Sequence, residues 1–453
     1  MKIIVAGVGK VGTSIAKQLS AEGYDLTLID TNQTLLNDLV ERYDAIGVQG
    51  NCASMPTLLE AGVMEADLLI ASTSADELNL LCCMTAQGIN KNLQTIGRIR
   101  NHEYTDQVYG MIDVFALSLV VNPEKQAARE IERLIRFPGF FRRETFAKGR
   151  VEIAELRIDK NSRLCDVSLM DFNSILKTKV LVCAVVRNGE AIIPHGMFVL
   201  KAGDRVFTTG STEALSSLLK NLGIITRKVR RILLCGGGRV SRYFAQAMAK
   251  TDVSISIIEQ NRQRCEELAE ILPNAHIILG DASSQSVLQK QHLDECDALI
   301  SCTGMDELNM IISMMAKSQG VPHVITKLSR LETGAMIFDS LDVGSVVCPK
   351  EQCCSTVVRY VRAMENQAGA AVSVHPIADG KAEALEFIVD SDTLHRGEPL
   401  KDITLRQNTI IAAITRGSKT ELPQGHSTFQ TGDVVIVVSS GDHVIHQLND
   451  IFR

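Results

Sequence analysis

Short, almost entirely apolar segments alternate with amphipathic ones along the first hundred residues. The apolar segments occupy residues 3–6, 26–30, 45–48, 68–72 and 94–99. Between them, apolar residues recur three or four positions apart, which predicts helices over residues 12–22, 35–43, 55–61 and 77–87. Apolar strands separated by helices indicate a parallel sheet covered on both faces. We therefore expect a Rossmann-like, doubly wound α/β domain.

The same pattern is repeated in the second half of the chain. Gly7 aligns with Gly236 at an offset of 229 residues (236 − 7), and one inserted residue later raises the offset to 230. Three pairs of similar segments carry the repeat: 2–12 with 231–241, 68–79 with 298–309, and 202–210 with 431–439. Since the last pair lies far beyond the strand and helix alternation, the repeat predicts duplication of a whole two-part unit.

The segments after each predicted sheet indicate a helix and then a small domain. Residues 123–136 and 349–362 both begin with proline, which suits the first position of a helix. Such a helix either packs within its own domain or crosses to a partner domain, and the sequence favours neither. Further on, strand-like runs at 181–187 and 205–209 and the Asn-Gly turn signal at 188–189 predict a small α+β domain.

These features divide the chain into four domains. The Phe-Pro-Gly sequence at 137–139 interrupts the helical pattern and marks the first boundary, and the basic run at 227–231 is expected to link the two copies. We expect a first sheet domain at 1–138, a first small domain at 139–226, a second sheet domain at 227–366 and a second small domain at 367–453.

Composition excludes several classes of protein. With 45% hydrophobic and 22% charged residues and a net charge of −6, the chain lacks the basic surplus of nucleic-acid-binding proteins. No apolar run approaches the roughly 20 residues that a membrane helix needs, and residues 114–121 fit a buried strand instead. The chain enters its first strand at Lys2 without a signal-like leader. We expect a cytoplasmic protein with no nucleic-acid partner.

The twelve cysteines do not form a metal or disulfide pattern. No C-x-x-C pair is present, and the adjacent pairs at 82–83 and 353–354 lie in helical patterns, where their side chains would point to different faces. Because cysteine is a common small core residue, we expect reduced thiols and no metal site.

A G-x-G-x-x-G motif follows the first predicted strand and opens a helix. Gly7 is expected to permit a tight turn, Gly9 to let the backbone approach a phosphate, and Gly12 to let helix and strand pack closely. The helix N-terminus supplies free N–H groups to an anion. Asp30 ends the second strand and can accept both ribose hydroxyls, whereas its charge disfavours the 2′-phosphate of NADP. Within this loop Val11 is a further candidate, and Lys10 either reaches a phosphate or is solvated.

The second copy departs from the motif at one position. Gly236 and Gly238 keep the turn, but Ser241 replaces the third glycine, and Glu259 replaces Asp30 as the acceptor. The second site is therefore either a working site or a degenerate scaffold copy. Its loop adds Arg239 and Val240 as the counterparts of Lys10 and Val11.

Other candidate contacts lie at the ends of later strands. Asn51 and Asp281, followed by Cys52 and Ala282, are expected to begin the helix after the third strand, where each caps the helix, contacts the adenine end of a ligand, or both. The remaining candidates end the fourth and fifth strands beside the expected crevice, and Arg98 and Lys327 among them are directed to the phosphates: Ser72, Thr73, Arg98, Thr303 and Lys327.

These motifs resemble those of the RCK (KTN) domains that regulate potassium conductance. The tandem form is similar to the TrkA-type peripheral subunits of bacterial Trk potassium-uptake systems. The resemblance covers essentially the whole chain and rests on the glycine loop with Asp30, the turns QGN (49–51) and LGD (279–281), and the segments ASTSADELN and SCTGMDELN. Ser241 is the main departure, and it bears on occupancy of the second site.

The resemblance implies more than the residues do. It implies adenine nucleotides as ligands, NAD(H) or ATP and ADP, and a potassium-translocating membrane subunit of the TrkH type as partner. It also implies self-association into a dimer or a tetrameric gating ring, at the cytoplasmic face of the cell membrane. The rival interpretation is an NAD-dependent oxidoreductase. We do not expect an enzyme, because His195 aligns with Gln424 and no catalytic histidine recurs between the small domains.

Overall fold

The structure is a computed structural model of the 453-residue chain. It describes residues 1–136, 142–223, 229–329, 343–365, 371–441, 445 and 447–453. The chain forms two compact units. The first contains residues 1–128 and 348–361, and the second contains residues 129–347 and 362–453.

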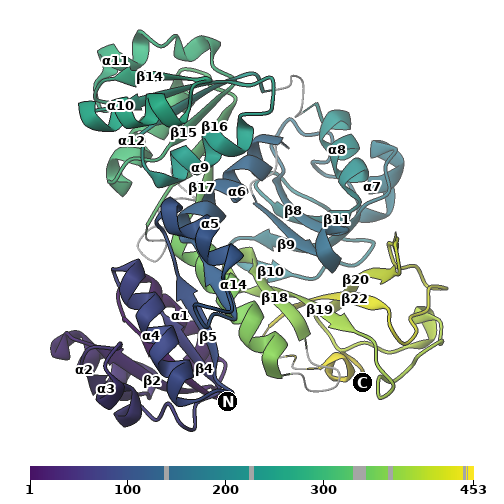
Figure 1. Ribbon diagram of the computed structural model, residues 1–453. Helices are drawn as coiled ribbons and strands as arrows, with labels where there is room; N and C mark the ends of the chain where they lie inside the picture. The colour runs from purple at the N-terminus through teal and green to yellow at the C-terminus, as the bar shows by residue number, and fades with distance from the viewer. Residues whose placement is uncertain (137–141, 224–228, 330–342, 366–370, 442–444, 446) are drawn as a thin grey trace. The chain divides into compact units, whose positions relative to one another are not determined.

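The first unit is built on a six-stranded parallel sheet in the order β3-β2-β1-β4-β5-β6. Figure 1 labels β2, β4 and β5 of this sheet, with α1, α2, α3 and α4 beside them. Its strands are β1 (Lys2–Ala6), β2 (Asp25–Asp30), β3 (Ile46–Gln49), β4 (Leu68–Ala71), β5 (Gln94–Arg98) and β6 (Leu119–Val121). The order reverses between β1 and β4, and in doubly wound sheets ligands bind at the carboxyl ends of the strands at this point.

Helices connect the strands and cover the sheet. They are α1 (Lys10–Ala21), α2 (Gln33–Tyr43), α3 (Met55–Glu60), α4 (Asp76–Ile89) and α5 (His102–Gly110). A further helix, α6 (Pro123–Arg136), follows the last strand, and its residues from Arg129 onward belong to the second unit. The expected doubly wound architecture is confirmed. The expectation of a buried strand over 114–121 is wrong in its first half, because only Leu119–Val121 is a strand and the Val114 side chain is 63% exposed.

The second copy repeats this sheet as β14-β13-β12-β15-β16-β17. Its strands are β12 (Arg231–Cys235), β13 (Ser254–Glu259), β14 (Ala275–Leu279), β15 (Ala298–Ser301), β16 (His323–Lys327) and β17 (Ser345–Val347). Its helices include α9 (Arg239–Met248), α10 (Arg262–Ile271), α11 (Gln285–Gln289) and α12 (Asp306–Ser318). The duplication inferred from the sequence therefore extends to strand order.

The helix that follows the second sheet, α14 (Pro349–Glu365), packs on the first sheet domain over most of its length. The Cys354 thiol lies 3.4 Å from the carbonyl oxygen of Ser14, and the Tyr360 hydroxyl donates to Gln94 Oε1 at 3.1 Å. The structure thus selects one of the two alternatives for this helix, which crosses to the other sheet domain of its own chain. The apolar face of α6 is buried as well, at Ala127, Ile131, Leu134 and Ile135.

Each small domain is a five-stranded antiparallel sheet, in the orders β10-β9-β11-β8-β7 and β18-β19-β22-β20-β21. The first consists of β7 (Arg142–Phe146), β8 (Val151–Arg157), β9 (Leu181–Arg187), β10 (Glu190–Ile192) and β11 (Arg205–Gly210), with helices α7 (Leu169–Leu176) and α8 (Thr212–Asn221). The second consists of β18 (Ala371–Ile377), β19 (Ala382–Ile388), β20 (Thr409–Arg416), β21 (Lys419–Glu421) and β22 (Val434–Ser440).

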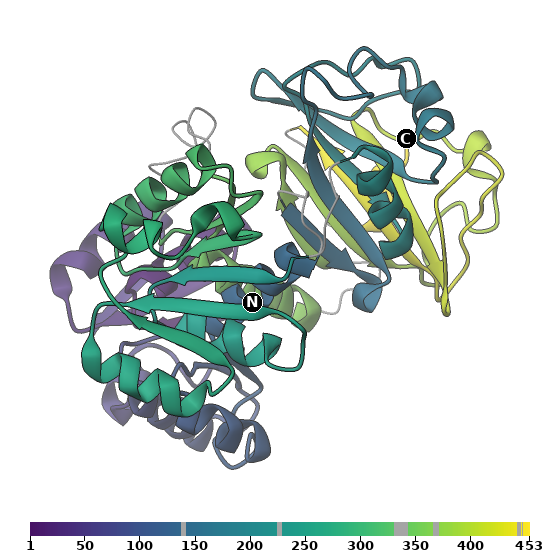
Figure 2. The same ribbon diagram turned by 90° about the horizontal axis from the view of Figure 1, so that it is seen from above.

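The two small sheets pack against each other (Figure 2), and they share one apolar core. Phe207 of the first and Ile436 of the second belong to it, and the imidazole of His375 pairs with Glu144 at 2.8 Å. The predicted turn at 188–189 is confirmed, with positive φ at both residues. All three predicted domain boundaries, and the Phe-Pro-Gly signal itself, lie outside the described residues.

All twelve cysteines are free. Both members of each adjacent pair are buried, and Cys82 and Cys83 belong to the same core, in agreement with the expectation that these cysteines are core residues. None of the helices that the structure describes is both long and apolar enough to cross a membrane.

Candidate nucleotide-binding sites

In the glycine turn of the first copy, two glycines have no room for a side chain, whereas the third has open space beside it. Gly7 has a φ of +85°, and a Cβ there would lie 2.7 Å from the backbone nitrogen of Thr73. At Gly12 a Cβ would lie 2.0 Å from the carbonyl oxygen of Gly7. Gly9 caps α1, and a Cβ there would meet nothing within 4 Å. The helix N-terminus is therefore approachable by an anion.

Asp30 binds this turn from the end of β2. Its Oδ2 accepts a hydrogen bond from the Val8 N–H and its Oδ1 from the Asn32 N–H, each at 2.9 Å. The carboxylate is thus already partly used, which the sequence did not reveal. Because each carboxylate oxygen can accept two hydrogen bonds, one position on each remains for a ribose hydroxyl.

Glu259 makes the same contacts in the second copy. Its Oε2 accepts from the Gly237 N–H and its Oε1 from the Asn261 N–H, each at 2.8 Å. Gly237 stands where the first copy has Val8, and a Cβ there would lie 2.5 Å from Leu268 Cδ1 and 3.1 Å from the carboxylate oxygen Oε2 of Glu259. The absent side chain therefore leaves room for Leu268 and for the Glu259 carboxylate, and the acceptor keeps its place in both copies.

A second compensated exchange explains Ser241. In the first copy the buried Ser72 hydroxyl donates to the carbonyl oxygen of Gly7 at 2.7 Å. In the second copy Cys302 replaces Ser72, and the Ser241 hydroxyl donates to the carbonyl oxygen of Gly236 at 2.5 Å. The serine that interrupts the glycine motif thus restores a hydrogen bond that would otherwise be lost.

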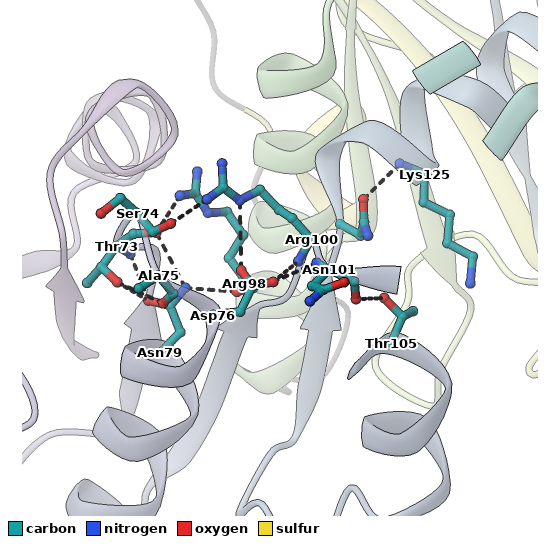
Figure 3. Close-up of polar contacts among 11 residues, drawn as sticks. Thr73, Ser74, Ala75, Asp76, Asn79, Arg98, Arg100, Asn101, Thr105 and Lys125 are labelled. Carbon is teal, nitrogen blue, oxygen red and sulfur yellow. Dashed lines mark hydrogen bonds and ion pairs between the residues drawn. The ribbon is translucent and has the colours of Figure 1, made fainter. Parts of the chain in front are cut away.

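The D-E-L-N segments position the loop after the fourth strand (Figure 3). The Oδ1 of Asn79 accepts from the N–H and the hydroxyl of Thr73, at 2.8 and 2.7 Å, and its Nδ2 donates to the Arg98 carbonyl oxygen at 2.8 Å. Asp76 accepts from the N–H groups of Arg100 and Asn101 at 2.8 and 2.6 Å. Two buried polar side chains therefore fix the ends of β4 and β5 relative to each other.

Two guanidinium groups lie together at this edge of the sheet. In Figure 3 the side chains of Arg98 and Arg100 both reach back toward the Thr73–Ser74 segment, where they donate to the carbonyl oxygens of Thr73 and Ser74. Burial lowers the pKa of Arg98, and the like charge of Arg100 lowers it further. Among the described residues, the Nε of Arg98 has no hydrogen-bond partner. An anion at this edge would relieve the repulsion between the two cations.

The second copy reproduces this network with a lysine. Asn309 accepts from the N–H and hydroxyl of Thr303 at 2.8 and 2.7 Å and donates to the Lys327 carbonyl oxygen at 2.9 Å. The Lys327 ammonium donates to the Thr303 carbonyl oxygen at 2.6 Å, where the first copy has Arg98.

The structure corrects the placement of Asn51 and Asp281. Neither begins a helix, because α3 and α11 start after the caps Ser54 and Ser284. Each instead closes a local turn, in which Asn51 Oδ1 accepts from the Ala53 N–H at 3.0 Å and Asp281 Oδ1 from the Ser283 N–H at 2.8 Å. The helix-cap interpretation is therefore wrong.

Several predicted contacts can involve only the backbone. Four of these residues have buried side chains: Val11, Cys52, Val240 and Ala282. Cys52 belongs to the apolar core of the first sheet domain and Ala282 to that of the second. A hydrogen bond with Cys82 lowers the pKa of the Cys52 thiol. By contrast, Lys10 and Arg239 are exposed at the first positions of α1 and α9.

Sequence reasoning did not single out Asn79, Asp76 or Arg100, nor Arg264 in the second copy. The recurrence of D-E-L-N at both positions was the available signal for the first two, since a polar pair kept in both copies of a buried segment indicates a structural or binding task. No comparable signal marked the two arginines.

Together these features define a tandem pair of doubly wound domains, each with a small antiparallel domain and a glycine turn held by an acidic residue. The sequence matches the TrkA-N domain model at residues 3–123 and 232–349 and the TrkA-C domain model at residues 153–223 and 384–453. The chain belongs to the family of Trk system potassium uptake proteins TrkA.

Individual relatives agree along the whole length. A Trk system potassium uptake protein TrkA homolog of Archaeoglobus fulgidus is 31% identical, and the alignment covers 100% of both chains. The Trk system potassium uptake protein TrkA of Vibrio alginolyticus is 29% identical over 100% of this chain and 99% of that one. These relatives are named for potassium uptake and not for a catalysed reaction, in agreement with the prediction that the chain is not an enzyme.

Solved structures share the fold at low identity. The GsuK channel has a TM-score of 0.64 at 15% identity and covers 97% of this chain and 76% of its own. The GsuK RCK domain has a TM-score of 0.62 at 15% identity, with 97% and 92% coverage. The RCK fold expected from the resemblance is thereby confirmed.

Proposed function

We propose that this chain is a nucleotide-sensing regulatory subunit that binds adenine nucleotides, NAD(H) or ATP and ADP, in both sheet domains and controls a membrane potassium-uptake partner. The observation that carries the proposal is that Asp30 and Glu259 accept from equivalent backbone N–H groups, one in the glycine turn and one at the cap of the next helix, although the side chains differ in length. The acceptor is kept in register in the second copy although Ser241 replaces the third glycine there, which supports binding in both copies.

The predicted site residues divide into three groups by their place in the proposed complex. The acidic residues accept the ribose, and the turns with their helix N-termini receive the phosphates. Arg98 in the first copy and Lys327 in the second lie at the ends of the fifth strands and complete the cationic side. A GsuK channel structure of the same fold, with a TM-score of 0.61, is bound to NAD, which supports this class of ligand.

The proposed partner is the potassium-translocating membrane subunit of a Trk system, of the TrkH type, with this chain assembled as a dimer or tetrameric ring on its cytoplasmic face. The naming of the full-length relatives for Trk potassium uptake supports the partner. A nucleotide controls such an assembly only if it binds two conformations with different affinity. We also propose that the four domains of the chain meet at residues 138/139, 226/227 and 366/367.

Calorimetric titration of the purified chain with NADH, NAD, ATP and ADP in turn tests the proposal. We expect binding at two sites per chain, one of which is lost in Asp30→Ala and the other in Glu259→Ala. Matched controls are Asp25→Ala and Ser254→Ala, exposed residues at the opposite ends of β2 and β13. If none of the four nucleotides binds the unaltered chain, the sheet domains are scaffolds and the proposal is wrong.

A further inference from the structure

The two copies differ at one cationic position beside the glycine turn. Arg264 lies in the first turn of α10, where its N–H donates to Oδ1 of the cap residue Asn261 at 3.0 Å. The corresponding residue in the first copy is Leu35 (264 − 229), whose N–H donates to the cap Asn32 at 3.1 Å. The backbone is therefore equivalent in both copies, and only the side chain differs.

The guanidinium of Arg264 is fixed against the turn. Its Nε donates to the carbonyl oxygen of Gly237 at 3.0 Å, and its Nη1 pairs with Glu267 at 2.8 Å. Gly237 is also the residue whose N–H donates to Glu259. Arg264 and Glu259 therefore bind the carbonyl oxygen and the N–H of the same glycine, and 26% of the arginine side chain remains exposed.

A guanidinium held at two points offers its planar face to a ligand with little further loss of conformational freedom. Such a face stacks on aromatic rings and attracts them electrostatically. In a doubly wound sheet the adenosine part of a nucleotide lies beside the acidic residue that ends the second strand. The base of a nucleotide bound at Glu259 would accordingly lie close to Arg264.

We infer that Arg264 is a stacking platform for the purine base in the second site, and that it makes the two sites unequal in their affinity for adenine nucleotides. This inference rests on the proposed function, since it assumes that the second copy binds a nucleotide. The first site has only the aliphatic Leu35 at this position and depends more on its ribose and phosphate contacts.

Calorimetric titration of the full chain with ADP tests the inference one site at a time. An Asp30→Ala background reports on the second site. In this background Arg264→Leu, which installs the residue of the first copy, is expected to weaken ADP binding about tenfold. Arg264→Lys keeps the charge but removes the plane, and we expect it to lose most of the same affinity. Retention of full affinity by the lysine variant would show a simple charge effect and overturn the stacking role.

The reciprocal change is made in a Glu259→Ala background, which reports on the first site. Leu35→Arg is expected to tighten ADP binding there severalfold. A thermal unfolding scan of each variant shows that the fold is retained, as expected when each residue already occupies the equivalent position in the other copy.

The outcomes separate this inference from the proposed function. If ADP does not bind the unaltered chain, the proposed function itself is contradicted and the role of Arg264 falls with it. If ADP binds at two sites and Arg264→Leu leaves the second dissociation constant unchanged, nucleotide sensing stands and Arg264 has no part in it.

Discussion

The Ser241 hydroxyl donates a hydrogen bond to the carbonyl oxygen of Gly236. In the first copy the equivalent carbonyl oxygen, that of Gly7, accepts from a residue of a different segment. There the donor is Ser72, which directly follows β4, whereas Ser241 belongs to the helix after the turn. The two copies therefore satisfy the same buried carbonyl from different elements. The loss of the third glycine at Ser241 is therefore compensated in the folded chain, because it accompanies the replacement of the first-copy serine by Cys302.

This exchange predicts a specific coupling in stability. Ser241→Gly should lower the free energy of unfolding of the second sheet domain by about 1–2 kcal/mol, because the Gly236 carbonyl loses its donor and a helix gains a glycine. Adding Cys302→Ser recreates the first-copy arrangement and should recover about 1 kcal/mol. Thermal unfolding of the single and double variants measures the coupling. Equal transition temperatures for the two variants would contradict it.

Loss of the Asp30 carboxylate should weaken nucleotide binding at the first site. Each hydrogen bond to a charged group contributes roughly 1.5–3 kcal/mol, so removal of about one ligand contact lowers affinity on the order of 10- to 100-fold. The measurement is calorimetric titration of Asp30→Ala beside the control Asp25→Ala. An unchanged dissociation constant would remove Asp30 from the site, while loss of the fold would show that its bonds to Val8 and Asn32 dominate.

Gly7 should be far less tolerant of alanine than Gly23, although both have positive φ, +85° and +81°. A Cβ at Gly23 meets nothing within 4 Å, so Gly23→Ala should cost only the conformational strain, about 1–2 kcal/mol. Gly7→Ala adds a collision with the Thr73 backbone 2.7 Å away and should cost at least about 2 kcal/mol more. Comparable losses of stability in the two variants would show that the Thr73 segment moves freely.

Asn79→Ala should destabilise the first sheet domain by about 2–3 kcal/mol. The side chain is fully buried, and its removal leaves the N–H of Thr73 and the carbonyl oxygen of Arg98 without their present partner. The exposed Asn37 on α2 is the control, where alanine should change stability by less than about 0.5 kcal/mol. Denaturant unfolding followed by circular dichroism compares the two, and a small effect at Asn79 would contradict its role as a tie between strands.

His323 should make the second sheet domain sensitive to acid. Burial, with a smaller contribution from Lys317, lowers the pKa of its imidazole to about 4. The unfolded chain then binds more protons than the folded one between about pH 6.5 and 4, so stability falls as pH decreases through this window. The loss is on the order of 2–3 kcal/mol by pH 4. His323→Gln should flatten this part of the stability profile, whereas a parallel profile would place the acid sensitivity elsewhere.

The fold was predictable because its signals are local and repeated. Apolar strands such as β1 and β4, the glycine turn and the offset between copies are all visible along the chain, and the strand order follows from the doubly wound pattern. The positions of Asp30 and Glu259 were predictable for the same reason, since each ends an apolar strand and therefore lies at the carboxyl edge of the sheet.

The remaining features depend on contacts between distant residues. That Gly237 makes room for Glu259, or that Ser241 replaces the donor lost at Cys302, is visible only when segments some 20 to 60 residues apart are brought together. The turns closed by Asn51 and Asp281 were misplaced because the same residue types favour helix caps and local turns alike. The pairing of Arg98 with Arg100 required knowledge of which side chains fold back over β4.

The placement of α14 has a consequence for biosynthesis. Cys348, the first residue of the segment that returns to the first unit, follows Ala128 by 220 positions (348 − 128). At a translation rate of about 5–20 residues per second, the first unit waits roughly 10–45 s for its last helix to leave the ribosome. During that interval the surface that Cys353, Cys354 and Val357 cover in the finished protein is open to water and to other chains. The first unit is therefore completed only when most of the second copy has been synthesised, so the two copies do not complete their folding in the order in which they are made.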